Sequence, residues 1–504
     1  MPLLTGLVAG LSPRHRAFAA LLSGALVATG HSPLSFWYVS LFALTFLLAL
    51  YLNTVGTRAA FWVGWLGGCG YFAVTLFWIV EPFLVDAARH GWMAPFALGF
   101  MATGLALFWG TGFALAHWLG RGAGSRLVAL IFALGLAELA RSYVLTGFPW
   151  GLLAYIWTET PIVQLAAFVG PHGLGVLTLC IAALPLAPLR FPVGIFAAAG
   201  LLALAYGLGH GRAAHPPAPR AEPVALRLVQ PNAPQTKKWD PEFAPLFLRR
   251  QMDLTAAEGA LRPDLVIWPE AAVTFWLGTE PRLQAEIAAA AGPGSRVILG
   301  ARRFAGRRIY NALAVLDDTG KAAQVYDKAR LVPFGEYVPF DGLLSRFGFQ
   351  GLAATQGGGF SAGSSGKLLD LGKSGLALPL ICYEAIFPNL ARSEPRADWI
   401  LQITNDAWFG EIAGPQQHLA QARMRAIEQG LPLVRVANTG ISAVIDATGA
   451  IVGALPLGKS GKLDALLPGR LPPTPYGKTG DWLMLFVLLA GCLAVGIWGT
   501  RKKD

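Results

Sequence analysis

The stretch LALPLICYEAIFP (376–388) changes character at Cys382, where a run of six apolar residues ends. An unbroken apolar run of this length is typical of a strand buried in an α/β domain. Residues that can begin a helix follow, so we expect the cysteine sulfur at a strand-to-helix turn, a geometry that exposes a nucleophile. Main-chain N–H groups and the helix dipole at such a turn favour the reactive thiolate. Taken alone, the cysteine would more simply be interpreted as a small buried hydrophobe.

Short apolar runs continue on both sides of this stretch and predict an α/β domain over residues 224–470. Helical patterns at 243–262, 283–292 and 415–430 lie between some of these runs. The predicted strands cover residues 224–230, 264–268, 296–301, 312–317, 376–381, 399–404, 433–438 and 442–446.

Two charged residues follow other predicted strands of this domain. WPE (268–270) ends one strand with Glu270, and YDK (326–328) places Lys328 after another. If these strand ends meet, Glu270 can take the proton of the Cys382 thiol, and Lys328 can hold positive charge near the developing oxyanion. Each charged residue alone would fit a solvated surface position. The combination predicts a Cys-Glu-Lys site.

The rest of the chain is too apolar for a soluble protein of its size. The 504 residues are 54% hydrophobic and only 14% charged, and runs long enough to cross a bilayer fill residues 1–210 and recur near the end. Residues 211–223 read as a linker, and residues 481–504 as a last span with its tail. We therefore predict a polytopic α-helical membrane domain joined to the α/β domain. Its spans, about eight, are expected at 17–30, 34–52, 59–80, 92–119, 127–145, 161–186, 191–208 and 482–499.

Positive charges in the short loops predict the orientation of these spans. They fall on one side of the membrane: Arg14, Arg16, Arg58, Arg121, Arg126, Arg190, Arg501, Lys502 and Lys503. By the positive-inside rule this side is the cytoplasm and holds both termini, so residues 224–470 lie outside it, in the periplasm if the cell has two membranes. The net charge of +11 then reflects membrane topology rather than nucleic-acid binding, because the basic residues form no stripe.

Five further residues allow two interpretations each. His418 suggests a Cys-His enzyme, but its helical surroundings favour a surface histidine. Asn405 and Asp406 could orient the site, although a cap on the turn after a strand is the simpler interpretation. Glu138 and Arg141, spaced i,i+3 in one predicted span, are expected to form a structural pair, with binding of a lipid headgroup as the alternative.

The remaining sequence evidence concerns a possible lid at residues 340–360 and the motifs expected of metal and phosphate sites. Residues 340–360 mix aromatic residues with glycines and could form a mobile lid that admits lipid, or a short core helix and a turn. The histidines and carboxylates lack metal-ligand spacing and no phosphate loop occurs, so we expect no metal and no cofactor. Cys69, Cys180 and Cys492 lie in predicted spans, which leaves Cys382 without a disulfide partner.

Several blocks of sequence occur together in a recognisable order. The five in the α/β domain are QPNAPQTKKWD (230–240), WPEAA (268–272), YDKARLVPFGEYVP (326–339), ICYEAIFP (381–388) and TNDAWFG (404–410). They resemble the nitrilase superfamily and, within it, the apolipoprotein N-acyltransferase family. SPLSFW (32–37) and TGFPW (146–150) extend the resemblance into the membrane half, which a soluble amidase would lack. The resemblance implies a nitrilase-like αββα sandwich.

The resemblance also implies a role for seven residues. It makes Cys382 the nucleophile, Glu270 the general base, Lys328 the oxyanion-stabilising lysine, Glu336 an additional catalytic-site glutamate, Tyr383 a main-chain oxyanion donor, Glu384 a support for the site and Trp239 a contact of the acyl donor. For Trp239 a packing role is equally consistent, since an indole suits a boundary between water and lipid but also a core.

The implied reaction is the last step of bacterial lipoprotein maturation, at the inner membrane. A fatty acyl group passes from a phospholipid, expected to be phosphatidylethanolamine, through a Cys thioester to the free α-amino group of the lipidated N-terminal cysteine of an apolipoprotein. Two alternatives remain. One is a membrane-tethered amidase or nitrilase that hydrolyses a small amide, and the other is a transporter with a catalytically dead domain.

Overall fold

The computed structural model describes residues 6, 8–189, 191–339 and 359–501. The chain forms two compact units, each described here by itself. The membrane unit comprises residues 1–215 and 474–504, and the sandwich unit comprises residues 216–473. The lid considered for residues 340–360 lies outside the described residues except at its last two positions.

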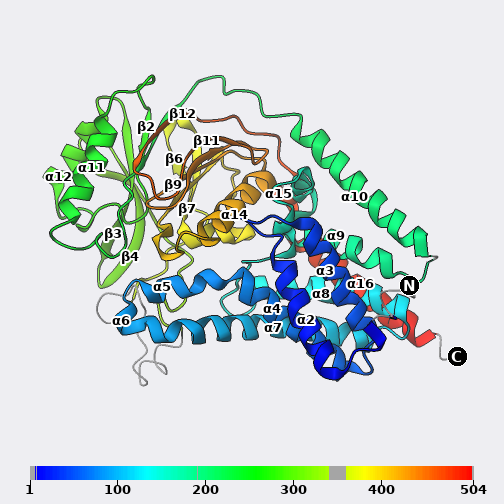
Figure 1. Ribbon diagram of the computed structural model, residues 1–504. Coiled ribbons are helices and arrows are strands. Elements are labelled where there is room, and N and C mark those ends of the chain that lie inside the picture. Colours follow the sequence, from blue (N-terminus) through cyan, green and yellow to red (C-terminus); the bar gives the residue numbers. More distant parts are fainter. Residues whose placement is uncertain (1–5, 7, 190, 340–358, 502–504) are drawn as a thin grey trace. The chain divides into compact units, whose positions relative to one another are not determined.

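Two six-stranded sheets build the sandwich unit (Figure 1). The first sheet has the order β12-β1-β2-β3-β4-β5, with β12 Gly461–Leu466, β1 Ala225–Gln230, β2 Leu265–Ile267, β3 Arg296–Ala305, β4 Arg308–Leu316 and β5 Ala322–Asp327. The second has the order β11-β10-β9-β8-β7-β6, with β11 Ile451–Leu455, β10 Ser442–Ile445, β9 Leu433–Ala437, β8 Trp399–Thr404, β7 Leu376–Ile381 and β6 Leu369–Asp370. In each sheet three central strands are parallel and the outer strands pair antiparallel.

The two sheets pack face to face and helices cover their outer faces. Leu228 of the first sheet and Trp399 and Val434 of the second belong to one buried cluster, because apolar side chains occupy the inner faces of both sheets. Helices α11 (Ala244–Ala256) and α12 (Pro281–Ala291) cover the first sheet, and α14 (Gly414–Gln429) covers the second. The unit is therefore an α–β–β–α sandwich, and the predicted fold of this half is confirmed.

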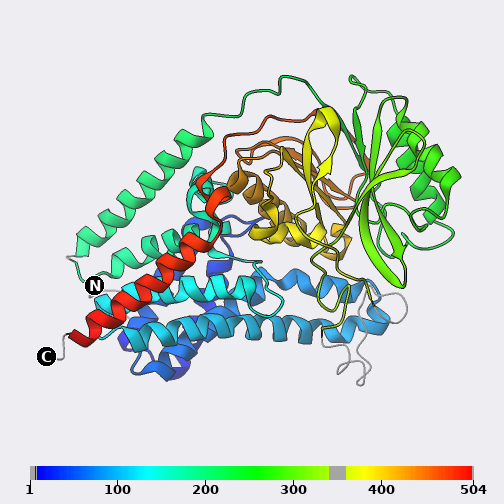
Figure 2. The same ribbon diagram turned by 180° about the vertical axis from the view of Figure 1, so that it is seen from behind.

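The membrane unit is helical, and by length and composition four of its described helices can cross a bilayer. A fifth crossing is possible where α4 and the following helices bend by 63°. The total of eight spans therefore stays a prediction. The main helices are α2 Pro13–Ala28, α3 Trp37–Leu52, α4 Thr57–Thr75, α7 Ala94–Leu119, α8 Ala123–Tyr143, α9 Ala166–Ala183, α10 Phe191–Ala213 and α16 Trp482–Arg501, the last packing against α8 (Figure 2).

Glu138 and Arg141 of α8 form a buried ion pair inside this unit. Arg141 donates from Nε and Nη2 to the Glu138 carboxylate at 3.2 and 2.9 Å. Its remaining N–H groups donate to the main-chain carbonyls of Phe148, Trp150 and Gly151. The pair thus holds the loop after α8, which agrees with the structural interpretation of these two charges.

Candidate active site

Cys382 directly follows β7 and begins the short 3-10 helix η8 (Cys382–Ile386). Its φ of 51° places a non-glycine residue in the left-handed region, which is rare and typical of functional turns. The expected strand-to-helix turn is therefore present. The side chain is only 6% exposed and lies against the core between the sheets.

Lys328 forms ion pairs with two carboxylates, which belong to separate segments of the chain. Its Nζ lies 3.2 Å from Glu270 Oε1 and 2.8 Å from Glu336 Oε1. Asn311 of β4 donates to the same two oxygens, at 2.7 and 3.0 Å. All four residues are buried. Glu270 and Lys328 follow β2 and β5, which run in the same direction because two antiparallel pairings separate β3 from β5, so both residues lie at the same edge of the first sheet.

The charges of this cluster act directly on the thiol. Burial by itself lowers the pKa of Lys328, but Glu270 and Glu336 raise it well above its usual value, so the lysine is an ammonium ion. Burial and the charge of Glu270 raise the pKa of the Cys382 thiol, while Lys328 lowers it. The thiol is therefore protonated at rest, and its reaction requires a base at the moment of attack.

Glu384 connects the Cys382 turn to the segment that carries Lys328. Its Oε2 accepts from the Ile381 N–H at 2.7 Å. Its Oε1 accepts from the Tyr326 hydroxyl and from the main-chain N–H groups of Ala329 and Arg330. Burial raises the pKa of Glu384 to about 7, although these hydrogen bonds oppose the shift. This carboxylate therefore fixes the two halves of the site to each other, while the neighbouring Tyr383 is buried beside it.

Lys238 is a buried residue that the sequence patterns did not single out. Its Nζ donates to the main-chain carbonyl of Glu270 at 3.1 Å. Burial lowers its pKa to about 8, while Glu270 and Cys382 oppose this shift. The adjacent Trp239 is 38% exposed and stands at the edge of the site. The burial of Lys238 could not be predicted from the sequence, because the two lysines of KKW are typical of solvated positions. Asn311 was detectable as the single polar residue inside the apolar run of β4.

Two expectations about the residues behind the cysteine are wrong. His418 is fully buried rather than on a helix surface, with Nδ1 3.0 Å from Asp406 Oδ1 and Nε2 3.2 Å from the Cys382 carbonyl oxygen. Asp406 does not cap a turn but pairs with the buried Arg435. Asn405 donates to Gln235 and accepts from another side chain instead of capping the following turn. The burial of α14 explains the error at His418. The error at Asn405 and Asp406 arises because their side chains bond other buried or partly buried side chains instead of the following turn.

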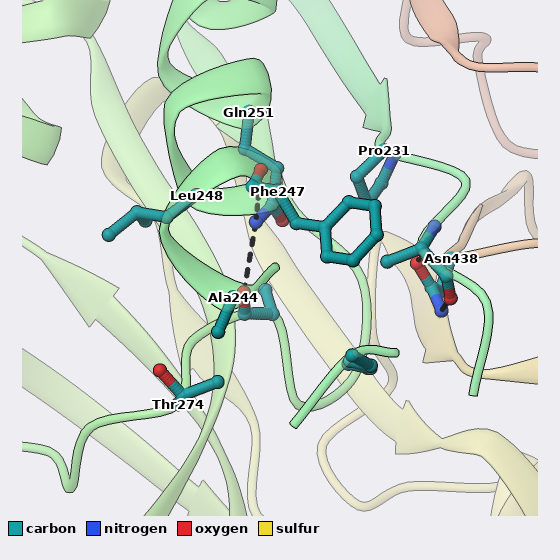
Figure 3. A pocket seen from close by; sticks show the side chains of 10 residues that line it. Pro231, Ala244, Phe247, Leu248, Gln251, Thr274 and Asn438 are labelled. Atoms are coloured by element: carbon teal, nitrogen blue, oxygen red, sulfur yellow. Dashed lines mark hydrogen bonds between the residues drawn. The ribbon is translucent and has the colours of Figure 1, made fainter. Parts of the chain in front are cut away.

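A cavity of about 10 Å³ lies beside Lys238, where Phe247 and Gln251 of α11 point inward (Figure 3). Its volume is that of about one water molecule, so an acyl chain cannot enter it. Within the described ranges, no three His, Cys, Asp or Glu side chains are arranged to hold a metal ion. The reactive groups that the described residues bring together at this site are a thiol, carboxylates and an ammonium group.

Two family models match separate parts of the chain. Residues 225–471 match the carbon-nitrogen hydrolase model. Residues 23–184 match the model of the apolipoprotein N-acyltransferase N-terminal domain. The first match spans both sheets of the sandwich unit, and the second lies in the membrane unit.

Curated relatives match nearly the whole chain. A protein of Rhodopseudomonas palustris named apolipoprotein N-acyltransferase is 41% identical, over 92% of either chain. Proteins of the same name from Caulobacter vibrioides (41%, over 87% of this chain and 86% of that one) and Brucella suis biovar 1 (37%, over 99% of both) are similar as well. A solved amidase from Nesterenkonia sp. covers 53% of this chain and 96% of its own at 18% identity with a TM-score of 0.35, a likeness too distant to bear on function.

Proposed function

The chain belongs to the apolipoprotein N-acyltransferase family, and from that premise we propose how its buried cluster carries out acyl transfer. The observation that supports the proposal most directly is the strained turn at Cys382 beside a lysine shared by two carboxylates. A thiol, a base and a fixed cation are what a thioester mechanism requires. We assign them to Cys382, Glu270 and Lys328.

In the first half-reaction Glu270 takes the proton from the Cys382 thiol, and the thiolate attacks an ester carbonyl of a phospholipid. Lys328 and the main-chain N–H of Tyr383 stabilise the tetrahedral oxyanion. The ester C–O bond breaks, Glu270 returns the proton to the departing oxygen, and a lysophospholipid leaves. The acyl group remains on sulfur as a thioester. Phosphatidylethanolamine is the donor we propose.

In the second half-reaction the α-amino group of the apolipoprotein's lipidated N-terminal cysteine attacks the thioester. Glu270 accepts a proton from the attacking amine, the C–S bond breaks, and the proton passes to the Cys382 sulfur. The products are an amide and the resting thiol. Glu336 holds Lys328 in place through both steps, Glu384 holds the turn, and Trp239 contacts the acyl donor at the rim.

The division of labour along the chain is also proposed. Residues 224–470 carry the chemistry, and about eight spans, in residues 1–210 and 481–504, hold the enzyme where both lipid substrates diffuse, with 211–223 as the linker. The positive charges of the short loops favour cytoplasmic termini and a catalytic domain outside the cytoplasm. Labelling a cysteine introduced at the exposed Arg307 with a membrane-impermeant maleimide in intact spheroplasts tests this orientation.

Intact-mass spectrometry tests the chemistry. Incubation of the purified full chain with phosphatidylethanolamine should add one acyl mass, which hydroxylamine removes and which is absent from Cys382→Ala. A peptide bearing a lipidated N-terminal cysteine should then discharge the adduct, whereas its N-acetylated form should not. Absence of an adduct with every phospholipid tried, from a folded protein whose Cys382 can be alkylated, would favour the amidase alternative.

A further inference from the structure

Arg302 of β3 lies between two tryptophans at the rim of the site. Its guanidinium carbon is 4.3 Å from the ring centroid of Trp239 and 4.5 Å from that of Trp276. Phe304 stacks on Trp276 with ring centroids 4.0 Å apart, and its side chain is 52% exposed. The planar guanidinium group of Arg302 thus lies in an aromatic cluster that is partly exposed to solvent.

The charge of Arg302 is not neutralised by the protein. Its neighbour Arg303 pairs with Asp327 through two hydrogen bonds. Arg302, by contrast, has no carboxylate partner within the described ranges: its Nη2 donates to the main-chain carbonyl of Thr274, and its Nε has no hydrogen-bond partner there. Burial lowers the pKa of this guanidinium, the effect expected of a partly desolvated cation without an anion. Such a group is costly unless an anion binds it.

The strand register places this cation next to the reacting groups. Arg302 is the cross-strand partner of Asn311, so their side chains leave the same face of the sheet about 5 Å apart at Cβ. Asn311 holds Glu270 and Glu336. Trp239 follows Lys238, which donates to the Glu270 carbonyl. Arg302 is therefore the cross-strand neighbour of the residue that holds the proposed general base.

We propose that Arg302, clamped between Trp239 and Trp276, binds the anionic phosphodiester of the acyl donor. This inference rests on the proposed function. In a glycerophospholipid only the glycerol carbons separate the ester from the phosphodiester, so residues that neighbour each other in the site must bind the two groups, as the pairing of Arg302 with Asn311 allows. A planar guanidinium matches two phosphate oxygens at once, and the stacked indoles keep its plane fixed before the lipid arrives. In this proposal the site recognises the phosphodiester and does not select among the headgroups attached to it.

Single-turnover acylation of Cys382 with two donors tests the assignment. One donor is phosphatidylethanolamine, and the other is p-nitrophenyl octanoate, an activated ester without phosphate. Arg302→Gln should slow acylation by the phospholipid about 10- to 100-fold at low lipid concentration, as expected for lost charge-assisted hydrogen bonds. Acylation by the octanoate should stay within twofold of wild type. Arg302→Lys should be intermediate, and Arg307→Gln, at the exposed tip of the same hairpin, should match wild type.

Competition identifies the source of the anion. Glycerophosphoethanolamine should inhibit acylation of wild type by phosphatidylethanolamine and lose this effect in Arg302→Gln. Equal slowing with both donors would make Arg302 structural and overturn the proposal, as would an unchanged rate with the phospholipid. Inorganic phosphate that competes as well as glycerophosphoethanolamine would also overturn it, by assigning the site to free phosphate. If wild type reacts with the octanoate but with no phospholipid, the proposed function itself fails.

Discussion

The two units each bury a cluster of opposite charges, and the clusters use their hydrogen-bonding capacity differently. In the membrane unit all five N–H groups of Arg141 donate hydrogen bonds, to Glu138 and to three main-chain carbonyls. In the sandwich unit Lys328 has two partners within the described ranges, Glu270 and Glu336, although an ammonium group can serve three.

This difference separates a scaffold from a reacting site. A cluster whose hydrogen-bond donors all have partners loses stability when any member is removed, and it has no donor left to bind a substrate. A cluster with spare capacity, set beside a protonated thiol on a strained turn, can receive an oxyanion at low reorganisation cost. Burial and charge alone would not distinguish them, because both clusters are almost completely buried.

Glu270→Gln should have the largest effect, because it removes the proposed proton acceptor and keeps its shape and its hydrogen bond from Asn311. We expect single-turnover acylation by phosphatidylethanolamine to fall about 10²- to 10⁴-fold. Alkylation of Cys382 by iodoacetamide at about pH 9 should instead become faster. The charge of Glu270 raises the pKa of the thiol, so its removal lets the thiolate appear at lower pH. Loss of both reactivities would point to a collapsed site.

Lys328→Met should slow the same acylation about 10²- to 10³-fold, the loss typical of a missing oxyanion stabiliser. It also leaves Glu270 and Glu336 close together without the cation that they share. Lys321→Met, in the exposed turn before β5, is the matched control and should be unaffected. A loss below tenfold in Lys328→Met would mean that this cluster, like that of Arg141, serves mainly as scaffold.

Arg141→Met should lower the free energy of unfolding by about 3 to 5 kcal/mol, because it strands the buried carboxylate of Glu138 and leaves carbonyls unpaired. Thermal unfolding in detergent measures the loss, and acylation per folded molecule should remain within twofold of wild type. The double variant Glu138→Gln/Arg141→Met should recover part of the stability, since it removes the stranded charge. A folded Arg141→Met protein with strongly reduced acylation would place this cluster in substrate binding.

His418→Leu should slow the reaction far less than the changes at Glu270 and Lys328, and should lower stability less than Arg141→Met. The imidazole faces the carbonyl of Cys382 and the carboxylate of Asp406, not a transferable proton on substrate. We expect acylation to slow less than tenfold and the free energy of unfolding to fall by about 1 to 3 kcal/mol, for buried groups left unpaired. The same single-turnover assay checks the rate. A loss as large as that of Glu270→Gln would make the histidine the base.

The fold of the sandwich unit was largely predictable, because its central strands are unbroken apolar runs. β7 and β8 occur at the predicted residues. The strands that escaped prediction, β5, β6, β11 and β12, lie at or next to sheet edges and carry polar or exposed residues, such as AAQVYD in β5. Edge strands owe their structure to pairing partners rather than to a local pattern. In the membrane unit, a bend after Thr75 interrupts one predicted span without any change in apolarity.

At the site, the sequence could locate residues that stand at strand ends, but not residues whose environment depends on burial. Cys382, Glu270 and Lys328 each stand at a strand end, which a pattern can locate. Asp406 looked like a cap on the turn after a strand, yet it is buried and pairs with Arg435. His418 looked like a surface residue because a helix with many polar residues usually faces water, yet α14 is buried along most of its length. No periodicity reveals such a helix, since its polar side chains bond one another inside the core.

The raised pKa of Cys382 also bears on the durability of the enzyme. Peroxides, disulfides and other oxidants attack thiolates far faster than thiols. A sulfur that keeps its proton at rest, as the raised pKa of the buried Cys382 favours, presents oxidants with a poor target. In an oxidising compartment, where the proposed orientation would place the sandwich unit, the burial that raises the pKa of this thiol would also slow its oxidation.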